Sequence, residues 1–201
     1  MTVLVVAEHD QHALKGDTLH AVMAACQISM FSDGQIHVLV VGAQVLAVAE
    51  QAVRINGVSK VLVADSRHLG VAGDVAAQAG YSHILFSSTA TGRNTVSRVA
   101  AALRVAQFDN ITRVLSPDTF ERQGQAGPAV SGASGGHGVK LITVCTAAFE
   151  AASGQGGLGH IEYLTMGWDF AVQTRPFSMD HPTIRRRAYG RTQRWHTSSF
   201  L

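Results

Sequence analysis

The chain has few cysteines, few charged residues and no long hydrophobic run. Of its 201 residues, two are cysteines, and 15% are charged while 46% are hydrophobic. Two cysteines cannot build a disulfide scaffold or a four-cysteine zinc site, and the excess of hydrophobic over charged residues excludes a disordered chain. No apolar run reaches the roughly 18 residues that a transmembrane helix needs. We therefore expect a chain with a packed core and no membrane span.

Nothing at the N-terminus indicates export or organelle import. The first residues, Thr2–Ala7, form an apolar, strand-like run, and no basic or Arg/Ser-rich leader precedes them. On this basis we expect a cytoplasmic protein.

Charge is unevenly distributed along the chain. Residues 1–160 hold ten Lys/Arg and eleven Asp/Glu, whereas residues 161–201 hold six Arg and three acidic residues. The near-neutral first part gives no support for nucleic-acid binding, and the run Arg185–Arg187 in the second part is weak evidence for it. The change in composition near residue 160 indicates a boundary.

Short apolar runs alternate with longer, alanine-rich stretches in the first half of the chain. Continuous apolar character over a few residues is typical of strands buried on both faces of a parallel sheet. Such runs are Thr2–Glu8, Gln35–Gly42, Lys60–Asp65 and His83–Ser88. The stretches between them have apolar residues at helical spacing and predict helices over Asp17–Ile28, Ala43–Ile55, Gly70–Ala79 and Thr91–Val105. The alternation predicts an α/β layer fold, with about five parallel strands and helices on both faces.

The expected core follows from these apolar runs. We expect the N-terminal strand, Thr2–Ala7, to lie beside or near Gln35–Gly42 in the sheet. Asp17 and Thr18 are expected to cap the first helix, and Gly57 to follow the second. The buried residues are predicted to include Val3, Val5, Val38, Val40, Leu62, Ile84, Leu85, Leu103 and Ile142.

After residue 105 this alternation ends. Four short strand-like pieces follow without helices between them: Ile111–Leu115, Thr119–Arg122, Gly127–Ser131 and Lys140–Cys145. We interpret them as one further strand and a short antiparallel extension of the sheet after residue 118. The domain is predicted to cover residues 1–152, followed by a glycine-rich linker over 153–160. Residues 161–201 show no clear strand or helix period, and we expect this basic tail not to pack as a domain.

The best candidate for a ligand site is the junction after the fourth strand. In a parallel α/β sheet, ligands bind at the carboxyl ends of strands, and a helix N-terminus there can hold a phosphate through its backbone N–H groups. The candidate anion-binding residues are Thr89, Thr91, Gly92, Arg93 and Asn94. The alternative is that the hydroxyls only cap the helix and that Arg93 points to water. Neither a Walker A sequence nor a Gly-x-Gly-x-x-Gly turn after the first strand is present.

Other reactive residues give no clear site. His9 and His12 flank Asp10 in the first loop, an arrangement that fits exposed loop histidines better than a metal or acid–base site. Cys145 ends an apolar strand without a neighbouring basic residue, so a reactive thiol is not indicated. We predict no catalytic residue and no metal site.

Seven segments, in the same order along the chain, resemble the alpha subunits of electron transfer flavoproteins. They are TVLVVAEHD (2–10), QIHVLVVG (35–42), KVLVAD (60–65), Gly80–Ser88, GRNTVSRVAAAL (92–103), SPDTFER (116–122) and KLITVCTAAF (140–149). The resemblance implies a three-layer, Rossmann-like parallel sheet of the adenine-nucleotide-hydrolase type. It also implies a heterodimer with a beta subunit, which receives electrons from flavin dehydrogenases and, in eukaryotic members, works in the mitochondrial matrix.

The resemblance covers the first domain of those subunits only. In the family, FAD lies mainly in the second domain of the alpha subunit, and nothing in Ile161–Leu201 is similar to that domain. No FAD-contacting residue can be carried over, so we expect the isolated chain to bind FAD poorly. The chain also departs from the family where it is shorter around Gly70–Gly80, where Pro128 replaces an asparagine, and where Cys145 replaces an arginine.

Two alternatives to an electron-transfer chain stay open. The related nucleotide-binding α/β fold holds AMP at loops that are similar to Glu8–Asp10 and Thr89–Asn94. A truncated remnant without a ligand or function is the other alternative.

Overall fold

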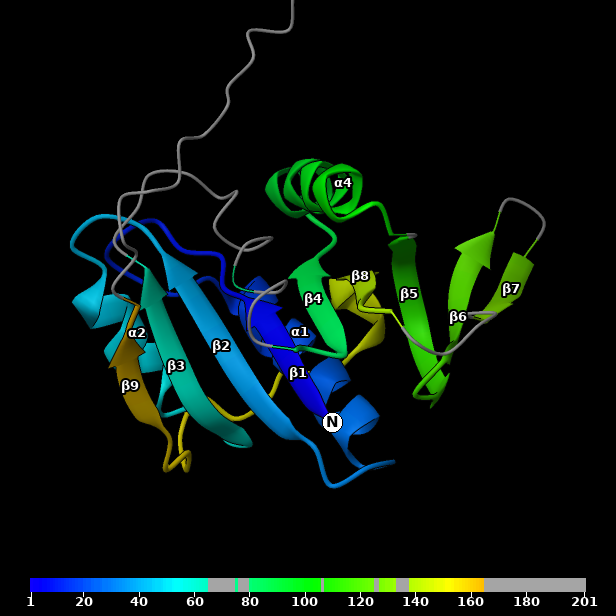
Figure 1. Ribbon diagram of the computed structural model, residues 1–201. Helices are drawn as coiled ribbons and strands as arrows, with labels where there is room; N and C mark the ends of the chain where they lie inside the picture. The colour runs from blue at the N-terminus through cyan, green and yellow to red at the C-terminus, as the bar shows by residue number, and fades with distance from the viewer. Residues whose placement is uncertain (65–74, 76–79, 106, 125–126, 133–137, 165–201) are drawn as a thin grey trace, which may run out of the picture. The chain divides into compact units, whose positions relative to one another are not determined.

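A computed structural model of the protein describes residues 1–64, 75, 80–105, 107–124, 127–132 and 138–164. The elements within these ranges alternate between strand and helix up to residue 103 and are mostly strands after it (Figure 1). The helices are α1 (Gly16–Ser29), α2 (Leu46–Ala52) and α4 (Ala90–Leu103). The strands are β1 (Thr2–Val6), β2 (Gln35–Val41), β3 (Val58–Ala64), β4 (His83–Ser87), β5 (Gln107–Ser116), β6 (Thr119–Gly124), β7 (Gly127–Gly132), β8 (Lys140–Val144) and β9 (His160–Tyr163).

One sheet contains all nine strands, in the order β7-β6-β5-β8-β4-β1-β2-β3-β9. The seven neighbouring strands β5, β8, β4, β1, β2, β3 and β9 pair in parallel. β6 pairs antiparallel with both β5 and β7. β1 lies directly beside β2, with Val3 opposite Ile36, which confirms the predicted pairing. β1 lies between β2 and β4 in the sheet. The chain first adds β2 and β3 on one side of β1 and then returns to add β4 on the other side.

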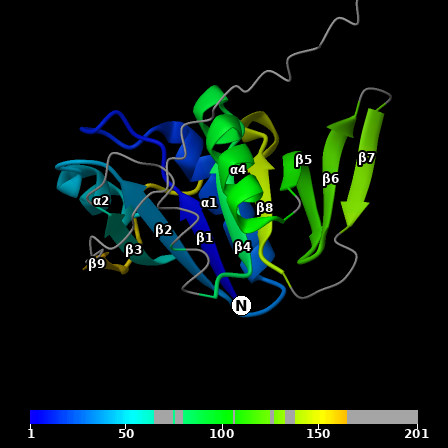
Figure 2. The ribbon, with the colours of Figure 1, turned by 45° about the horizontal axis from the view of Figure 1, so that its top comes forward.

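Helices cover both faces of the sheet, which makes the predicted three layers (Figures 1 and 2). Val3 and Val5 of β1 face the cluster that includes α1 and α2, whereas Leu4 and Val6 face the cluster that includes α4. Because successive side chains of a strand point to opposite faces, a strand between two helical layers must be apolar at every position. This requirement explains the continuous apolar runs in the sequence.

The predicted core is confirmed with one exception. Eight of the nine residues are buried: Val3, Val5, Val38, Val40, Leu62, Ile84, Leu85 and Ile142. The ninth, Leu103, is only half-buried, because it is the last residue of α4. Gly57 has a positive φ of 89°, as a turn between α2 and β3 requires. The predicted helix over Gly70–Ala79 lies outside the described residues, apart from the buried Val75.

The interpretation of Lys140–Cys145 as part of an antiparallel extension is wrong. β8 inserts between β4 and β5 and runs parallel to both, so only the β6–β7 hairpin forms the extension. All five β8 residues are buried, which is typical of a central strand with a helical layer on each face.

A strand, β9, follows the residues that we interpreted as a linker, although the sequence around it shows no clear strand period. β9 pairs in parallel with β3, and Ile161 packs against the core on the α1 side. The backbone N–H groups of Asn56 and Gly157 donate to Ser153 and Arg54, at 2.9 and 2.8 Å. The segment 153–160 is therefore bonded at two points to the turn between α2 and β3 before its last residue enters β9. The parallel part of the sheet has seven strands rather than about five.

Candidate functional site

A cavity of about 730 Å³ opens at the carboxyl ends of β1 and β2, next to the first turn of α4. The end of β1 and its loop contribute Val6, Ala7, Glu8, His9, Gln11 and Lys15. The end of β2 contributes Val41–Gln44, and Phe86, Thr91, Gly92 and Thr95 complete the lining from β4 and α4. This is the place where an open α/β sheet binds ligands, because the loops of neighbouring strands diverge there.

Glu8 is the buried acidic residue of this cavity. It is 9% exposed, and one of its carboxylate oxygens, Oε1, accepts a hydrogen bond of 2.5 Å from the hydroxyl of Thr89. The backbone of Glu8 is held as well, since its N–H donates to Thr18 Oγ1 and its carbonyl accepts from Lys15 N–H, at 2.9 and 2.8 Å. The start of α1 and the start of α4 therefore fix the position of Glu8.

The prediction that Thr18 caps α1 is wrong. Its buried hydroxyl donates to the carbonyl of Glu8 at 3.2 Å, and Lys15, the N-cap residue of α1, makes no side-chain capping bond. The residue that the sequence identified as a helix cap instead ties the helix to the end of β1.

The five candidate anion-binding residues separate into two groups. Thr89 caps α4 by accepting from Gly92 N–H at 3.0 Å, and Thr91 and Gly92 line the cavity. Arg93 and Asn94 are exposed and lie outside the lining, and the guanidinium of Arg93 donates to Ser88 Oγ at 3.4 Å. The structure therefore agrees with the capping interpretation for Thr89.

The carboxylate of Glu8 is itself the anion at the N-terminus of α4. A helix N-terminus carries a partial positive charge, which a carboxylate nearby stabilises and which would otherwise attract a phosphate. A phosphate at this position would lie beside the negative charge of Glu8. One signal for this role is visible in the sequence, an acidic residue directly after a buried strand, but its partner Thr89 is 81 residues away.

The first loop is ordered by its own side chains. His9 Nε2 donates to the carbonyl of Val41 at 3.0 Å, and His9 Nδ1 accepts from Gln11 N–H at 3.1 Å. Asp10 accepts from the N–H groups of His12 and Ala13, and these two bonds hold the pKa of Asp10 below its usual value. His9 thus links the β1 and β2 loops at the rim of the cavity, whereas Asp10 and His12 are not among the lining residues.

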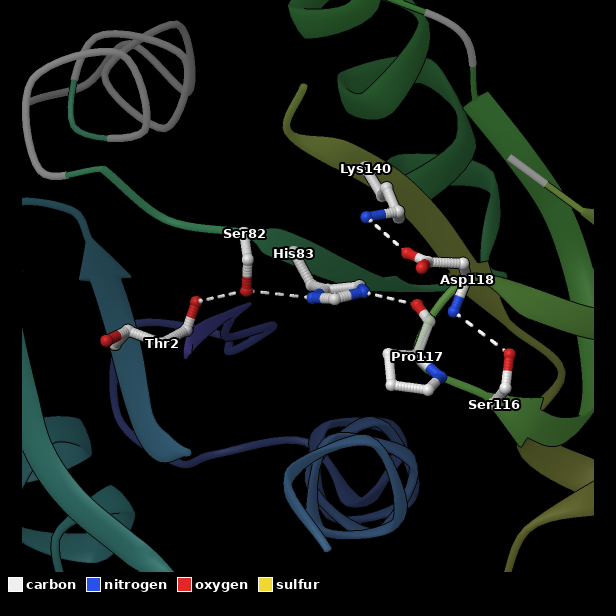
Figure 3. A network of polar contacts seen from close by, with 7 residues as sticks. All are labelled: Thr2, Ser82, His83, Ser116, Pro117, Asp118 and Lys140. Carbon is white, nitrogen blue, oxygen red and sulfur yellow. Dashed lines mark hydrogen bonds and ion pairs between the residues drawn. The ribbon is translucent and has the colours of Figure 1, made fainter. Parts of the chain in front are cut away.

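A second polar network lies at the opposite, amino ends of the strands, away from the cavity (Figure 3). His83 is fully buried, with Nδ1 at 2.9 Å from Ser82 Oγ and Nε2 donating to the carbonyl of Pro117 at 2.7 Å. Asp118 forms an ion pair of 2.7 Å with the buried Lys140. Burial lowers the pKa of His83 below its usual value. The network joins β4 and β8 to the β5–β6 turn, which indicates a structural role.

Within the described ranges, no group of three His, Cys, Asp or Glu side chains has metal-binding geometry. In the same ranges, no helix is long and apolar enough to cross a membrane. Both cysteines are free and half-buried, and burial raises the pKa of the Cys26 thiol.

Comparison with known proteins gives one consistent family. The electron transfer flavoprotein domain model matches residues 3–167. An electron transfer flavoprotein subunit alpha of Pseudomonas aeruginosa is 44% identical over 172 residues, which are 82% of this chain and 54% of that protein. The corresponding subunit of Paracoccus denitrificans is 37% identical over 164 residues, 78% of this chain and 52% of its own length. A probable mitochondrial alpha subunit of Caenorhabditis elegans is 38% identical over 170 residues, 80% of this chain and 50% of its own length. The chain therefore spans about half the length of these relatives.

Proposed function

The chain belongs to the electron transfer flavoprotein family, and from this premise we propose that it is an alpha-type chain that pairs with a beta subunit. In this proposal the pair accepts electrons from flavin dehydrogenases and carries them on FAD. The observation that supports it is the family match over residues 3–167, together with relatives that are named as alpha subunits. A cytoplasmic location is part of the same proposal.

The described residues do not fit FAD. A dinucleotide needs a glycine-rich turn at a helix N-terminus for its pyrophosphate, and the turn after β1 is Glu8–His9–Asp10. The other helix N-terminus at the cavity, that of α4, already has the carboxylate of Glu8 beside it. We therefore place the FAD of the proposed pair outside the described residues, and we assign to this domain the role of scaffold and docking surface.

The proposal is tested by pairing and by flavin titration. Coexpression with a beta subunit is expected to give a 1:1 complex that coelutes in size-exclusion chromatography. Titration of the isolated chain with FAD at micromolar concentration is expected to leave flavin fluorescence unchanged. Absence of any complex would contradict the pairing, and stoichiometric quenching by the chain alone would contradict our placement of the FAD.

A second candidate function is binding of a mononucleotide such as AMP. The observation that favours it is the cavity at the carboxyl ends of β1 and β2, which has the location and size of a ligand site in this fold. Mass spectrometry of the purified chain under non-denaturing conditions would detect a bound nucleotide. A chain that neither pairs nor carries a nucleotide would agree with the remnant interpretation.

A further inference from the structure

We propose that Asn56 is a site of spontaneous deamidation that the segment 153–157 controls. The reaction is blocked while this segment holds the turn between α2 and β3, and it proceeds when the segment detaches. The inference goes beyond both candidate functions and depends on neither. It follows from three observations: the residue that follows Asn56, the conformation of the turn, and the two hydrogen bonds that hold the turn in place.

Asn56 is the reactive residue, because it is exposed and is followed by glycine. In deamidation, the backbone nitrogen of the next residue attacks the side-chain amide carbon of the asparagine. A C–N bond forms, the amide nitrogen leaves as ammonia with the proton of the backbone nitrogen, and a five-membered succinimide ring remains. Water then opens the ring at either carbonyl, which gives aspartate or isoaspartate.

The other two asparagines of the chain serve as internal controls. Asn94 is followed by threonine and Asn110 by isoleucine. The branched Cβ atoms of these residues crowd the attacking nitrogen, whereas a glycine leaves it unhindered. The sequence therefore directs the reaction to Asn56.

The folded turn around Asn56 does not have the conformation that the attack requires. Val58 N–H donates to the carbonyl of Ile55 at 3.2 Å, so these residues close a four-residue β-turn. φ is 89° at Gly57 but not positive at Asn56, which identifies a type II turn. In this turn ψ of the second residue is about +120°, whereas ring closure needs a ψ of about −120°, where the attacking nitrogen eclipses Cβ. The side-chain amide of Asn56 cannot reach that nitrogen until the turn opens.

The segment 153–157 holds this turn from outside. Asn56 N–H donates to the carbonyl of Ser153 at 2.9 Å, and Gly157 N–H donates to the carbonyl of Arg54 at 2.8 Å. The segment leads into β9, which lies beside β3 at an edge of the sheet (Figure 1). None of the four β9 residues is buried, and elements with few buried contacts open locally more often than the core. Detachment of this segment breaks both bonds and lets the exposed turn change conformation while the rest of the sheet stays folded.

Deamidation makes such an opening permanent. Isoaspartate places an additional methylene group in the backbone between residues 56 and 57. The four-residue turn with its bond from Val58 to Ile55 then cannot re-form unchanged, and the segment 153–157 loses its support. The reaction thus converts a transient detachment of β9 into a lasting one.

The rate of the reaction in the unmodified full chain tests the inference. The chain is incubated at mildly alkaline pH with and without urea and then digested, and mass spectrometry follows the mass increase of the peptide that contains Asn56. The folded chain is expected to deamidate at Asn56 at least about tenfold more slowly than the unfolded chain. Asn94 and Asn110 should stay unmodified over the same period. Equal rates at Asn56 with and without urea would overturn the inference.

Hydrogen exchange of the Asn56 amide measures detachment of the segment, because this amide donates to Ser153. The factor by which folding slows deamidation should equal, within about threefold, the factor by which folding slows exchange of this amide. Both factors should be smaller than the protection of a core amide such as that of the buried Val5. Deamidation slowed as strongly as exchange at Val5 would require global unfolding and would overturn the role of the segment.

Two variants of the segment complete the test. In Gly157→Ala, the added Cβ atom would overlap the carbonyl oxygen of Ile55, and deamidation at Asn56 should become at least about fivefold faster. In Gly154→Ala, the Cβ atom would meet nothing within 4 Å, and the rate should stay unchanged. Acceleration in neither variant, or equal acceleration in both, would overturn the inference. The pairing with a beta subunit and the binding of a nucleotide are measured separately and are not affected by either result.

Discussion

The backbone of Gly157 lies directly against the carbonyl oxygen of Ile55. A Cβ atom at residue 157 would overlap that oxygen and would lie 2.7 Å from the carbonyl oxygen of Val53. In the same place, Gly157 N–H donates to the carbonyl of Arg54 at 2.8 Å. The glycine is required because two backbone segments touch there, and this close contact leads the chain into β9.

Gly157→Ala is therefore expected to destabilise the protein by about 1–3 kcal/mol, because the backbone must move or β9 must detach from β3. The matched control is Gly154→Ala, where a Cβ atom would meet nothing within 4 Å. The measurement is the free energy of urea unfolding for both variants. Equal stability of the two variants would mean that the segment is a linker, as the sequence had suggested.

Glycines at the starts of α4 and α1 allow the effect of close packing on stability to be measured separately from the effect of helix propensity. In the first turn of α4, a Cβ atom at Gly92 would overlap the carbonyl oxygen of Ser87 and would lie 3.1 Å from Glu8 Oε1. In α1, a Cβ atom at Gly16 would meet nothing within 4 Å. We expect Gly92→Ala to cost about 2–3 kcal/mol, whereas Gly16→Ala should be neutral or stabilise by up to about 1 kcal/mol. Thermal unfolding should show a lower midpoint for Gly92→Ala and an unchanged or higher midpoint for Gly16→Ala, and a loss of stability in both variants would contradict this account.

The sequence predicted those parts of the fold in which neighbouring residues carry the signal. The apolar runs of β1 to β4 and the helical spacing of α1 and α4 follow from burial between layers, which affects every position of an element. The antiparallel hairpin β6–β7 follows from two strand-like runs around Gly124 and Gly127. Local pattern was sufficient for all of these.

Local pattern could not predict β9 or the position of β8. Of the four β9 residues only Ile161 packs against the core, because β9 is an edge strand, and a four-residue edge strand has almost no periodicity. The glycines before it resemble a linker in sequence, but Gly157 and Gly159 both lie against backbone carbonyls. β8 has the apolar run of a strand, and its parallel direction depends on the return of the chain from β7, which no short window contains.

The sequence points to the start of α4, which borders the cavity, but it does not point to Glu8. The α4 junction was identified from Thr89–Asn94, because hydroxyls and a glycine at a helix start are visible in sequence. Glu8 appears in the sequence only as the end of the run Thr2–Glu8 and in the loop Glu8–Asp10. Its burial and its bond to Thr89 depend on β1 and β4 being neighbours in the sheet. Contacts between residues so far apart in the sequence depend on the order of the strands in the sheet, which a local sequence pattern does not contain.

The Asp118–Lys140 ion pair should stabilise the protein more than the other ion pair of the described part, Lys60–Glu162. The Lys140 side chain is 8% exposed, whereas that of Lys60 is 27% exposed. Asp118→Asn would leave the charge of Lys140 buried without its counter-charge, and we expect a loss of about 1–2 kcal/mol. Glu162→Gln, the matched control, should cost less because water can solvate Lys60. Urea unfolding of the two variants gives the comparison, and the reverse order would contradict it.

The buried His83 is expected to make the stability of the protein depend on pH. Burial lowers the pKa of His83 in the folded chain, so between that value and the ordinary value of 6.5 the unfolded chain binds more protons. The free energy of unfolding should therefore decrease as the pH falls below about 6.5, by at most about 1.4 kcal/mol per pH unit for one proton. The nearby Lys140 also lowers this pKa, whereas the carbonyl of Pro117 and the charge of Asp118 raise it by smaller amounts than burial lowers it.

His83→Gln tests this assignment, because glutamine keeps a donor for the carbonyl of Pro117 but does not titrate. Its unfolding free energy should change less than that of the unmodified chain between pH 7.5 and pH 5. Some dependence should remain, since burial also lowers the pKa of His37, which bonds to the hydroxyl of Tyr81 at 2.8 Å. His12→Gln, which removes a histidine from an exposed loop, should keep the slope of the unmodified chain. If His83→Gln and His12→Gln gave the same slope as the unmodified chain, His83 would not be the source of the pH dependence.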